Sequence, residues 1–252
     1  GYHLDLHSFP TRRSSDLMSN EWIWIFFAFI NFLLFIGMYV LFGKTGIFVW
    51  IGVATILANI QVTKQITLFG FEATLGNIMY GTIFLATDAL NEFFTKKDAK
   101  RAVWLGFFIL IATTLIMQVA LWFQPNESDF AQGSLETIFG FFPRLVLASL
   151  IAFLISQLLD VYLFQKIKSY LPQTKFLWIR NNGSTILSQL VDTAIFVPIA
   201  FLGTFPNEVL FGIGGIFVST YLIKVFVALL DTPFLYLMKR LKPFQEKPET
   251  AR

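Results

Sequence analysis

Apolar residues form seven long runs along the chain, each about 20 residues or longer, and polar residues gather between them. The runs are Trp22 to Phe42, Ile47 to Thr67, Leu75 to Thr95, Val103 to Phe123, Phe141 to Lys166, Ser184 to Phe205 and Val209 to Met238. A helix of about 20 apolar residues crosses a hydrocarbon core of about 30 Å. A membrane β-barrel would instead show strands of about ten residues with alternating polarity. The pattern therefore predicts an all-α fold, a polytopic membrane bundle of seven transmembrane helices.

The composition agrees with this prediction and excludes several classes of protein. Hydrophobic residues make up 56% of the chain and charged residues 14%, whereas about 25% of a soluble domain is charged. Soluble enzymes and DNA-binding proteins are therefore excluded. The chain has no cysteine, and both histidines, His3 and His7, precede the first run. We expect no metal site, no cofactor and no nucleic-acid partner.

The two ends of the chain differ from the rest. Residues 1–17 (GYHLDLHSFPTRRSSDL) are polar and unpatterned, and Met18 follows as a plausible native start. This segment resembles translated adapter sequence, so we expect a non-native leader that does not belong to the fold. Residues 18–242 are expected to form the membrane domain, and residues 243–252 a short tail.

The loop charges predict the orientation, because lysine and arginine concentrate in cytoplasmic loops. The basic residues are Lys96, Lys97, Lys100 and Arg101 after the third run, Lys166, Lys168, Lys175 and Arg180 after the fifth, and Lys239, Arg240 and Lys242 after the seventh. The acidic residues of the opposing loops are Glu72, Glu127, Asp129, Glu136 and Glu208. This alternation predicts an outside N-terminus and a cytoplasmic C-terminus.

Polar residues recur inside the runs, where each charge costs a few kcal/mol and is expected to face the bundle interior. The third run contains TDALNEFF, the fifth SQLLD and the sixth SQLVD, while the seventh carries Lys224 and Asp231. A structural role is the alternative for each. Glu92 suits an ion pair with Lys96 or another loop cation. Lys224 suits an ion pair with Asp160 or Asp192, because Asp231 lies two turns away on the same helix.

Several carboxylates and amides in one part of a membrane suit a polar heteroaromatic solute. A guanine-like edge offers N1–H and an exocyclic amine, which one carboxylate accepts together, and an O6 acceptor that an amide can meet. Aromatic rings such as Tyr80, Phe84, Phe93 or Tyr162 could stack on such a base.

Four segments together resemble the queuosine precursor transporter family, also called the vitamin uptake transporter family. They are ANIQVTKQI, GNIMYGTIFLATDALNEFFTKKDAKRAVWLGF, SQLLDVYLFQKIK and RNNGSTILSQLVDTAIF. The resemblance implies a core of six helices, so Trp22 to Phe42 would be an additional N-terminal helix. It also implies import of 7-cyano-7-deazaguanine, 7-aminomethyl-7-deazaguanine or queuine across the bacterial inner membrane for tRNA modification.

The resemblance points to substrate-binding residues on four of the runs, and we add Lys224 on the seventh. The resulting set is Asn59, Gln61, Asp88, Asn91, Glu92, Gln157, Asp160, Asn182, Ser188, Gln189, Asp192 and Lys224. No catalytic residue is expected.

Two other functions stay open. One is the substrate-capturing subunit of a vitamin importer that needs a separate ATPase, because the chain has no GxxxxGK[ST] phosphate-binding loop of its own. The other, less favoured, is an intramembrane enzyme whose aspartates act as an acid–base pair, although no GxGD-like sequence surrounds them. The expected partners are a small-molecule base and the lipid bilayer, with a second copy of the chain or an ATPase module left open.

Overall fold

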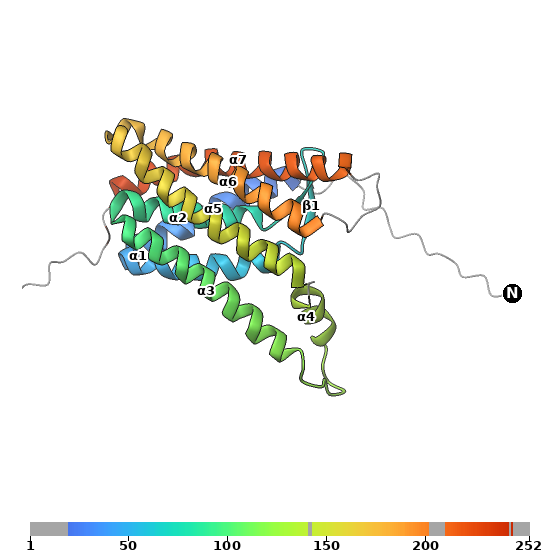
Figure 1. The fold of residues 1–252 in the computed structure, drawn as a ribbon. Coiled ribbons are helices and arrows are strands. Elements are labelled where there is room, and N and C mark those ends of the chain that lie inside the picture. The colour runs from blue at the N-terminus through green and yellow to red at the C-terminus, as the bar shows by residue number, and fades with distance from the viewer. Residues whose placement is uncertain (1–19, 141–142, 202–209, 242, 244–252) are drawn as a thin grey trace, which may run out of the picture.

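The computed structural model describes residues 20–140, 143–201, 210–241 and 243, in which every regular element is a helix apart from one small hairpin (Figure 1). The predicted leader and nearly all of the predicted tail lie outside these residues. The elements are α1 (Asn20–Gln61), β1 (Gln65–Leu68), β2 (Phe71–Thr74), α2 (Asn77–Phe93), α3 (Lys96–Ala120), α4 (Gln132–Phe139), α5 (Pro143–Tyr170), η1 (Thr174–Phe176), α6 (Leu177–Phe201) and α7 (Leu210–Arg240).

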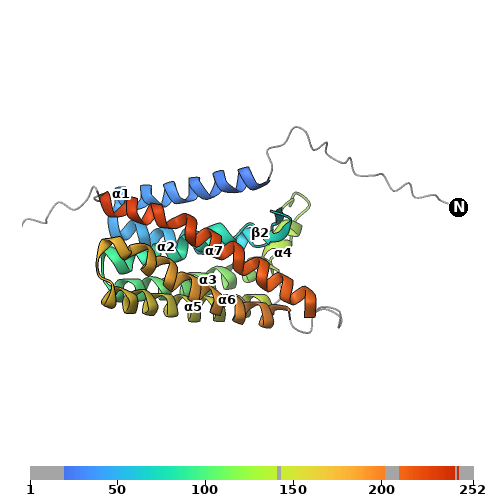
Figure 2. The ribbon, with the colours of Figure 1, turned by 90° about the horizontal axis from the view of Figure 1, so that it is seen from above.

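Helix α1 consists of two antiparallel arms that meet at Gly43 (Figure 2). The backbone of Gly43 has φ 56° and ψ −135°, a combination that is essentially restricted to glycine. The first arm begins and the second arm ends at the same end of the bundle. There, Asn20 Nδ2 donates to the Thr67 carbonyl at 3.1 Å and the Phe69 N–H donates to Glu21 Oε1 at 3.0 Å. The first two apolar runs are therefore the two arms of one helical hairpin.

The second predicted run extends too far, because α1 ends at Gln61 and residues 65–74 form an antiparallel β-hairpin. Leu68 pairs with Phe71, which leaves Phe69 and Gly70 as a two-residue turn. Both turn residues have positive φ, 51° and 80°, as a type I′ hairpin turn requires. The apolar residues Ile66 and Leu68 thus alternate along a strand rather than continuing the helix.

Helix α2 lies in the middle of the bundle, in contact with α1, α3, α5 and α7. Nearly all of its 17 residues are buried, including Asp88 and Asn91. The helices around it carry large exposed apolar side chains such as Phe108, Ile116 and Leu222. Five helices of the described part, α1, α3, α5, α6 and α7, are long and apolar enough to cross a membrane. The protein is therefore a polytopic helical membrane protein with polar residues in its core.

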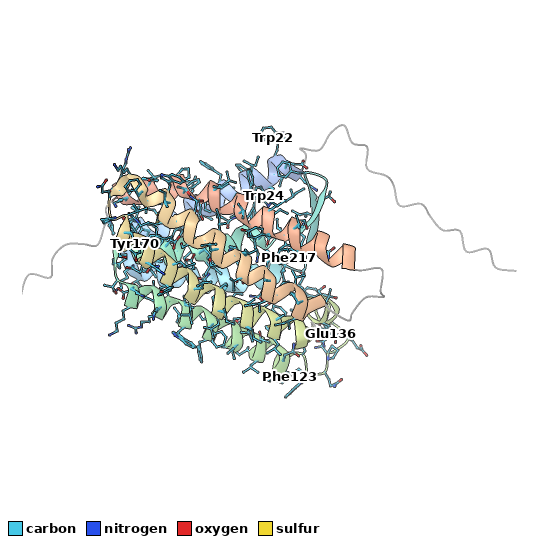
Figure 3. All side chains as sticks on the ribbon, turned by 45° about the horizontal axis from the view of Figure 1, so that its top comes forward. Trp22, Trp24, Phe123, Glu136, Tyr170 and Phe217 are labelled. Atoms are coloured by element: carbon cyan, nitrogen blue, oxygen red, sulfur yellow. The ribbon has the colours of Figure 1, made fainter. Side chains whose placement is uncertain are left out.

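Two helices begin seven residues earlier than the sequence predicts. Helix α3 begins at Lys96 instead of Val103, so the basic residues expected in a loop form its first turns. Helix α6 begins at Leu177 instead of Ser184, so Arg180, Asn181 and Asn182 lie inside the helix. These residues look unsuited to lipid, but in the structure they are buried against neighbouring helices. The loop after α3 contains the short helix α4, which the apolar pattern did not predict. Figure 3 places Glu136 and Phe123 at the end of the bundle that carries this loop.

Candidate functional site

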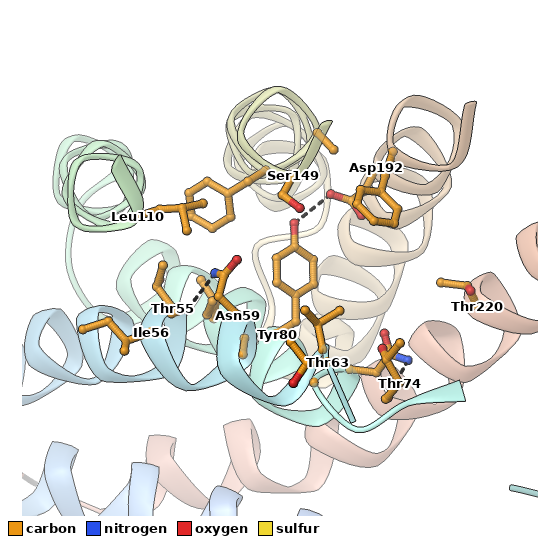
Figure 4. A pocket seen from close by; sticks show the side chains of 18 of the residues that line it. Thr55, Ile56, Asn59, Thr63, Thr74, Tyr80, Leu110, Ser149, Asp192 and Thr220 are labelled. Carbon is orange, nitrogen blue, oxygen red and sulfur yellow. Dashed lines mark hydrogen bonds between the residues drawn. The ribbon is translucent and has the colours of Figure 1, made fainter. Parts of the chain in front are cut away.

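A cavity of about 330 Å³ lies between the second arm of α1, the β-hairpin and helices α2 to α7 (Figure 4). We call it the pocket. Gln65 and Thr74 of the hairpin and Ile138 and Phe139 of α4 belong to its wall, so it lies toward the end of the bundle that carries the hairpin and α4 (Figure 1). Its volume is within the range of cavities that bind small molecules.

Asp192 of α6 is the best-connected polar residue in the pocket wall. Its Oδ1 accepts hydrogen bonds from Tyr80 Oη at 2.7 Å and from Ser156 Oγ at 3.0 Å, and its Oδ2 forms an ion pair with Lys224 Nζ. Asp192 is 3% exposed and Lys224 7%. The Lys224 ammonium also lies 5.0 Å from the centre of the Tyr80 ring. The prediction that Lys224 pairs with an aspartate of a neighbouring helix is confirmed, and that aspartate is Asp192.

The rest of the wall combines single polar groups with apolar and aromatic surface. Asn59 Nδ2 donates to the Thr55 carbonyl at 2.8 Å, which leaves Asn59 Oδ1 as an acceptor. Phe139, Phe153 and Phe196 supply aromatic surface. Besides Tyr80, the hydroxyl groups of the wall come from Thr55, Thr63, Thr74, Thr113, Thr114, Ser149 and Thr220. Such a pocket suits a flat aromatic molecule with polar edges, because most of its wall is apolar and a few polar groups fix orientation.

Three members of the sequence-predicted set line the pocket, namely Asn59, Asp192 and Lys224. Four other members lie in a fully buried group carried by α2, α5 and α6: Asp88, Gln157, Asp160 and Ser188. Ser188 Oγ donates to Asp160 Oδ1 at 3.0 Å, and the Thr87 hydroxyl meets Gln157 Oε1 at 3.2 Å. These contacts join α5 to α6 and to α2 away from the pocket wall.

Glu92 and Asn91 lie at the opposite end of the bundle from the hairpin, in an ionic group that we call the Glu92 cluster. The Glu92 carboxylate lies within ion-pair distance of Lys168 at 3.2 Å, Arg180 at 2.9 Å and Lys239 at 2.5 Å. The prediction that Glu92 forms an ion pair is confirmed, but its partners lie in α5, α6 and α7 rather than in loops. Lys96 instead lies 5.3 Å from the Tyr162 ring centre. The cluster joins the ends of α2, α5, α6 and α7.

The remaining three members of the set also lie outside the pocket wall. Asn182 Nδ2 donates to Thr232 Oγ1 at 2.7 Å and to the Trp178 carbonyl at 2.9 Å, so this amide joins α6 to α7. Gln189 is buried in α6, and Gln61 is half-buried at the end of α1. Whether any of these side chains contacts substrate stays a prediction.

Two residues of the Asp192 network were not in the predicted set. Tyr80 was expected to stack on a ligand, but here its hydroxyl donates to Asp192. Ser156 precedes Gln157 in the SQLLD segment and donates to Asp192 from the neighbouring helix. The sequence does hold a signal for Ser156, because SQLLD and SQLVD place a serine four residues before an aspartate in both helices.

Helical spans around an internal pocket with a few polar groups are typical of small-molecule membrane transporters, and comparison with known proteins gives the family. The family model described as "Putative vitamin uptake transporter" matches residues 74–238. The chain belongs to this family.

Several relatives carry the name of one transported class. A protein of Bacillus subtilis (strain 168) named "Probable queuosine precursor transporter" is 52% identical over 230 residues, which are 91% of this chain and 99% of that protein. The Escherichia coli (strain K12) protein named "Queuosine precursor transporter" is 30% identical over 146 residues, 57% of this chain and 62% of that protein. A Haemophilus influenzae protein with the same name as the Bacillus one is 29% identical over 153 residues, 56% of this chain and 62% of that protein. No solved structure gives a significant match.

Proposed function

We propose that the protein imports queuosine precursors, the 7-deazaguanine bases, across the bacterial cytoplasmic membrane to supply tRNA modification. The names of its relatives support the substrate class. The observation that carries the proposal is the pocket itself, in which a carboxylate, an ammonium and an amide oxygen share one wall with aromatic rings. The relatives' names and the pocket both favour a transporter over the intramembrane enzyme.

The chemistry of a 7-deazaguanine matches these groups. Its N1–H and exocyclic amine donate hydrogen bonds to Asp192, and its O6 accepts one from the Lys224 ammonium. Asn59 Oδ1 offers a further acceptor, and Phe153 offers a ring on which the base stacks. Of the sequence-predicted set, we therefore propose Asn59, Asp192 and Lys224 as direct contacts.

Replacement of Asp192 by Asn tests this site, because it exchanges one acceptor oxygen for a donor that faces the donors of the base. Loss of a charge-assisted hydrogen bond costs about 1.5 to 3 kcal/mol, so the Kd for 7-cyano-7-deazaguanine should rise about tenfold to a hundredfold. Tyr80→Phe removes only one neutral donor to Asp192 and should change the Kd by less than about tenfold. The measurement is titration calorimetry on folded, detergent-purified protein.

The control for both variants is Glu127→Gln, which makes the same chemical change at an exposed residue of the loop between α3 and α4. If Asp192→Asn binds the base as tightly as Glu127→Gln does, the pocket assignment is wrong.

For the topology we propose seven spans, namely the two arms of α1 and helices α2, α3, α5, α6 and α7, with the N-terminus outside. The pocket then lies toward the outer face and the Glu92 cluster at the cytoplasmic face. This rests on the positive-inside rule. Because the chain has no cysteine, single cysteines at Lys97 and Glu127, both exposed, report accessibility directly. An impermeant maleimide added to intact cells should label position 127 alone, and labelling of position 97 would reverse the topology.

The alternative with a separate ATPase is distinguished by reconstitution. The purified chain alone in liposomes should take up labelled 7-cyano-7-deazaguanine if it is a complete importer. Uptake that appears only when an ATPase and a coupling subunit co-purify with it would favour the substrate-capturing role.

A further inference from the structure

Helices α5 and α6 carry the same five-residue pattern, SQLLD at 156–160 and SQLVD at 188–192. In each helix the serine and aspartate are four residues apart and share a face. The helices pack against each other, and the contacts are reciprocal: Ser156 Oγ lies 3.0 Å from Asp192 Oδ1, and Ser188 Oγ lies 3.0 Å from Asp160 Oδ1. The two patterns thus form a local two-fold arrangement with two equivalent carboxyl positions.

The two positions differ in what neutralises them. Asp192 has the Lys224 ammonium as its partner. Asp160 instead has a second carboxyl nearby, that of Asp88 in α2. The Thr185 hydroxyl lies 3.3 Å from Asp160 Oδ1 and 3.4 Å from Asp88 Oδ2, so it contacts both carboxyls. Both aspartates are 0% exposed. In the described part of the chain, no ion pair includes Asp88 or Asp160.

The neighbouring cations are already engaged. On α7, Lys224 pairs with Asp192 and Lys239 with Glu92, while Arg180 of α6 and Lys168 of α5 also belong to the Glu92 cluster. The further charged group that faces Asp88 and Asp160 is another acid, Asp231 of α7, which accepts a hydrogen bond from Asn181 Nδ2 at 2.8 Å. Three acidic side chains therefore share a buried region without a cation among the described residues.

Hydrogen-bond donors are also too few for two ionised carboxylates. The Thr185 hydroxyl has one proton and two aspartates within its reach. The single proton of Ser188 is shared between Asp160 and the Thr185 carbonyl, and that of Ser184 between Asp160 and the Asn181 carbonyl. Asp88 Oδ1 and Asp160 Oδ2 have no partner among the described residues. A buried acceptor without a donor costs free energy, and a buried unpaired charge costs far more.

One atom of each of two neighbouring amides also has no partner. Gln157 Nε2, one turn before Asp160, and Asn181 Oδ1, beside Asp231, have no partner in the part of the chain that the structure describes, although Gln157 is 0% and Asn181 1% exposed. The region therefore lacks hydrogen-bond partners as well as a positive charge among the described residues. A proton supplies both the charge and the donor that the Asp88–Asp160 pair lacks.

We propose that Asp88 and Asp160 form a proton-binding site, and that protons which enter through it drive accumulation of the substrate. The site is one helical turn from the Asp192 network, since Asp160 and Ser156, like Ser188 and Asp192, are four residues apart. Because Ser156 of α5 donates to Asp192, substrate that rearranges the Lys224–Asp192 pair also acts on α5, the helix that carries Asp160. This inference rests on the proposed import function.

The test uses the full chain in liposomes with the membrane potential clamped at zero, labelled 7-cyano-7-deazaguanine outside, and a pH-sensitive dye inside. With the outside one pH unit more acidic, the base should accumulate up to about tenfold if one proton accompanies each molecule, since one pH unit is a tenfold ratio of proton concentrations. Addition of the base should also acidify the interior. The double variant Asp88→Asn with Asp160→Asn should lose accumulation and acidification but keep exchange of labelled for unlabelled base.

Glu127→Gln is the matched control and should behave as the wild type. Wild-type exchange without acidification or pH-driven accumulation overturns the proton site while the import function stands. Accumulation driven by a sodium gradient at equal pH also overturns it. Absence of any exchange by the wild type overturns the import function and this inference together. Because the wild type alone gives these outcomes, the test does not depend on the folding of the double variant.

Discussion

Replacement of Lys224 by Met should reduce the amount of folded protein more than almost any other single change in the pocket wall. Lys224 and Asp192 are 7% and 3% exposed, and the substitution leaves the Asp192 carboxylate buried with only the Tyr80 and Ser156 hydroxyls as donors. Removal of one partner of a buried ion pair costs about 3 to 5 kcal/mol. The measurement is the yield of monodisperse protein after heating in detergent.

The second half of this prediction is a rescue. Asp192→Asn in addition to Lys224→Met replaces the stranded charge by a neutral amide of the same size, so the yield of folded protein should return toward the wild-type value. Import should stay lost, because both groups proposed to meet the base are gone. Lys97→Met, at an exposed residue, is the control and should change the yield little. A Lys224→Met protein as stable as this control would show that the ion pair contributes nothing to folding.

The sequence predicts the membrane helices well where lipid contact decides the residue types. The run Val209 to Met238 overlaps α7 almost completely, and Val103 to Phe123 covers all of α3 except its first two turns. The sequence prediction fails where protein rather than lipid surrounds the chain. Arg180 looks like a loop cation because lipid excludes it, yet it belongs to α6 and its side chain is fully buried. Its guanidinium donates hydrogen bonds to Glu92 and to the carbonyls of Leu171 and Gln173.

The candidate site shows the same limit. Intramembrane polar residues are recognisable from sequence, but their division into a pocket, a buried acidic group and an ionic cluster depends on how the helices pack. Asp88 and Glu92 share a face of α2 at i and i+4, yet Asp88 meets Thr185 and Glu92 meets Arg180. Only the packing of α6 against α2 separates the two. The serine–aspartate pattern of α5 and α6 is visible in the sequence, and its reciprocal contacts are visible only in the structure.

The distribution of these groups fits a transporter whose pocket is accessible from one side. The pocket lies toward the hairpin and α4, and the Glu92 cluster holds together α2, α5, α6 and α7 at the other end. Ion pairs that join helix ends are suited to close one face while the other admits substrate, since a change in helix packing would have to break them.

Glu92→Gln should therefore destabilise the protein by about 3 to 5 kcal/mol, because it removes the one carboxylate that faces three cations and leaves the Arg180 guanidinium buried with only carbonyl partners. The matched control is Asp98→Asn at the start of α3, whose ion pair with Lys44 is partly exposed, with side-chain exposures of 15% and 43%. An exposed pair contributes about 0.2 to 1 kcal/mol.

Thermal unfolding of the two purified variants in the same detergent measures this difference. Glu92→Gln should unfold at a clearly lower temperature than Asp98→Asn, because the ends of α2, α5, α6 and α7 separate more readily. Equal unfolding temperatures would show that the Glu92 cluster contributes no more than an exposed ion pair, and this end of the bundle would then depend on apolar packing alone.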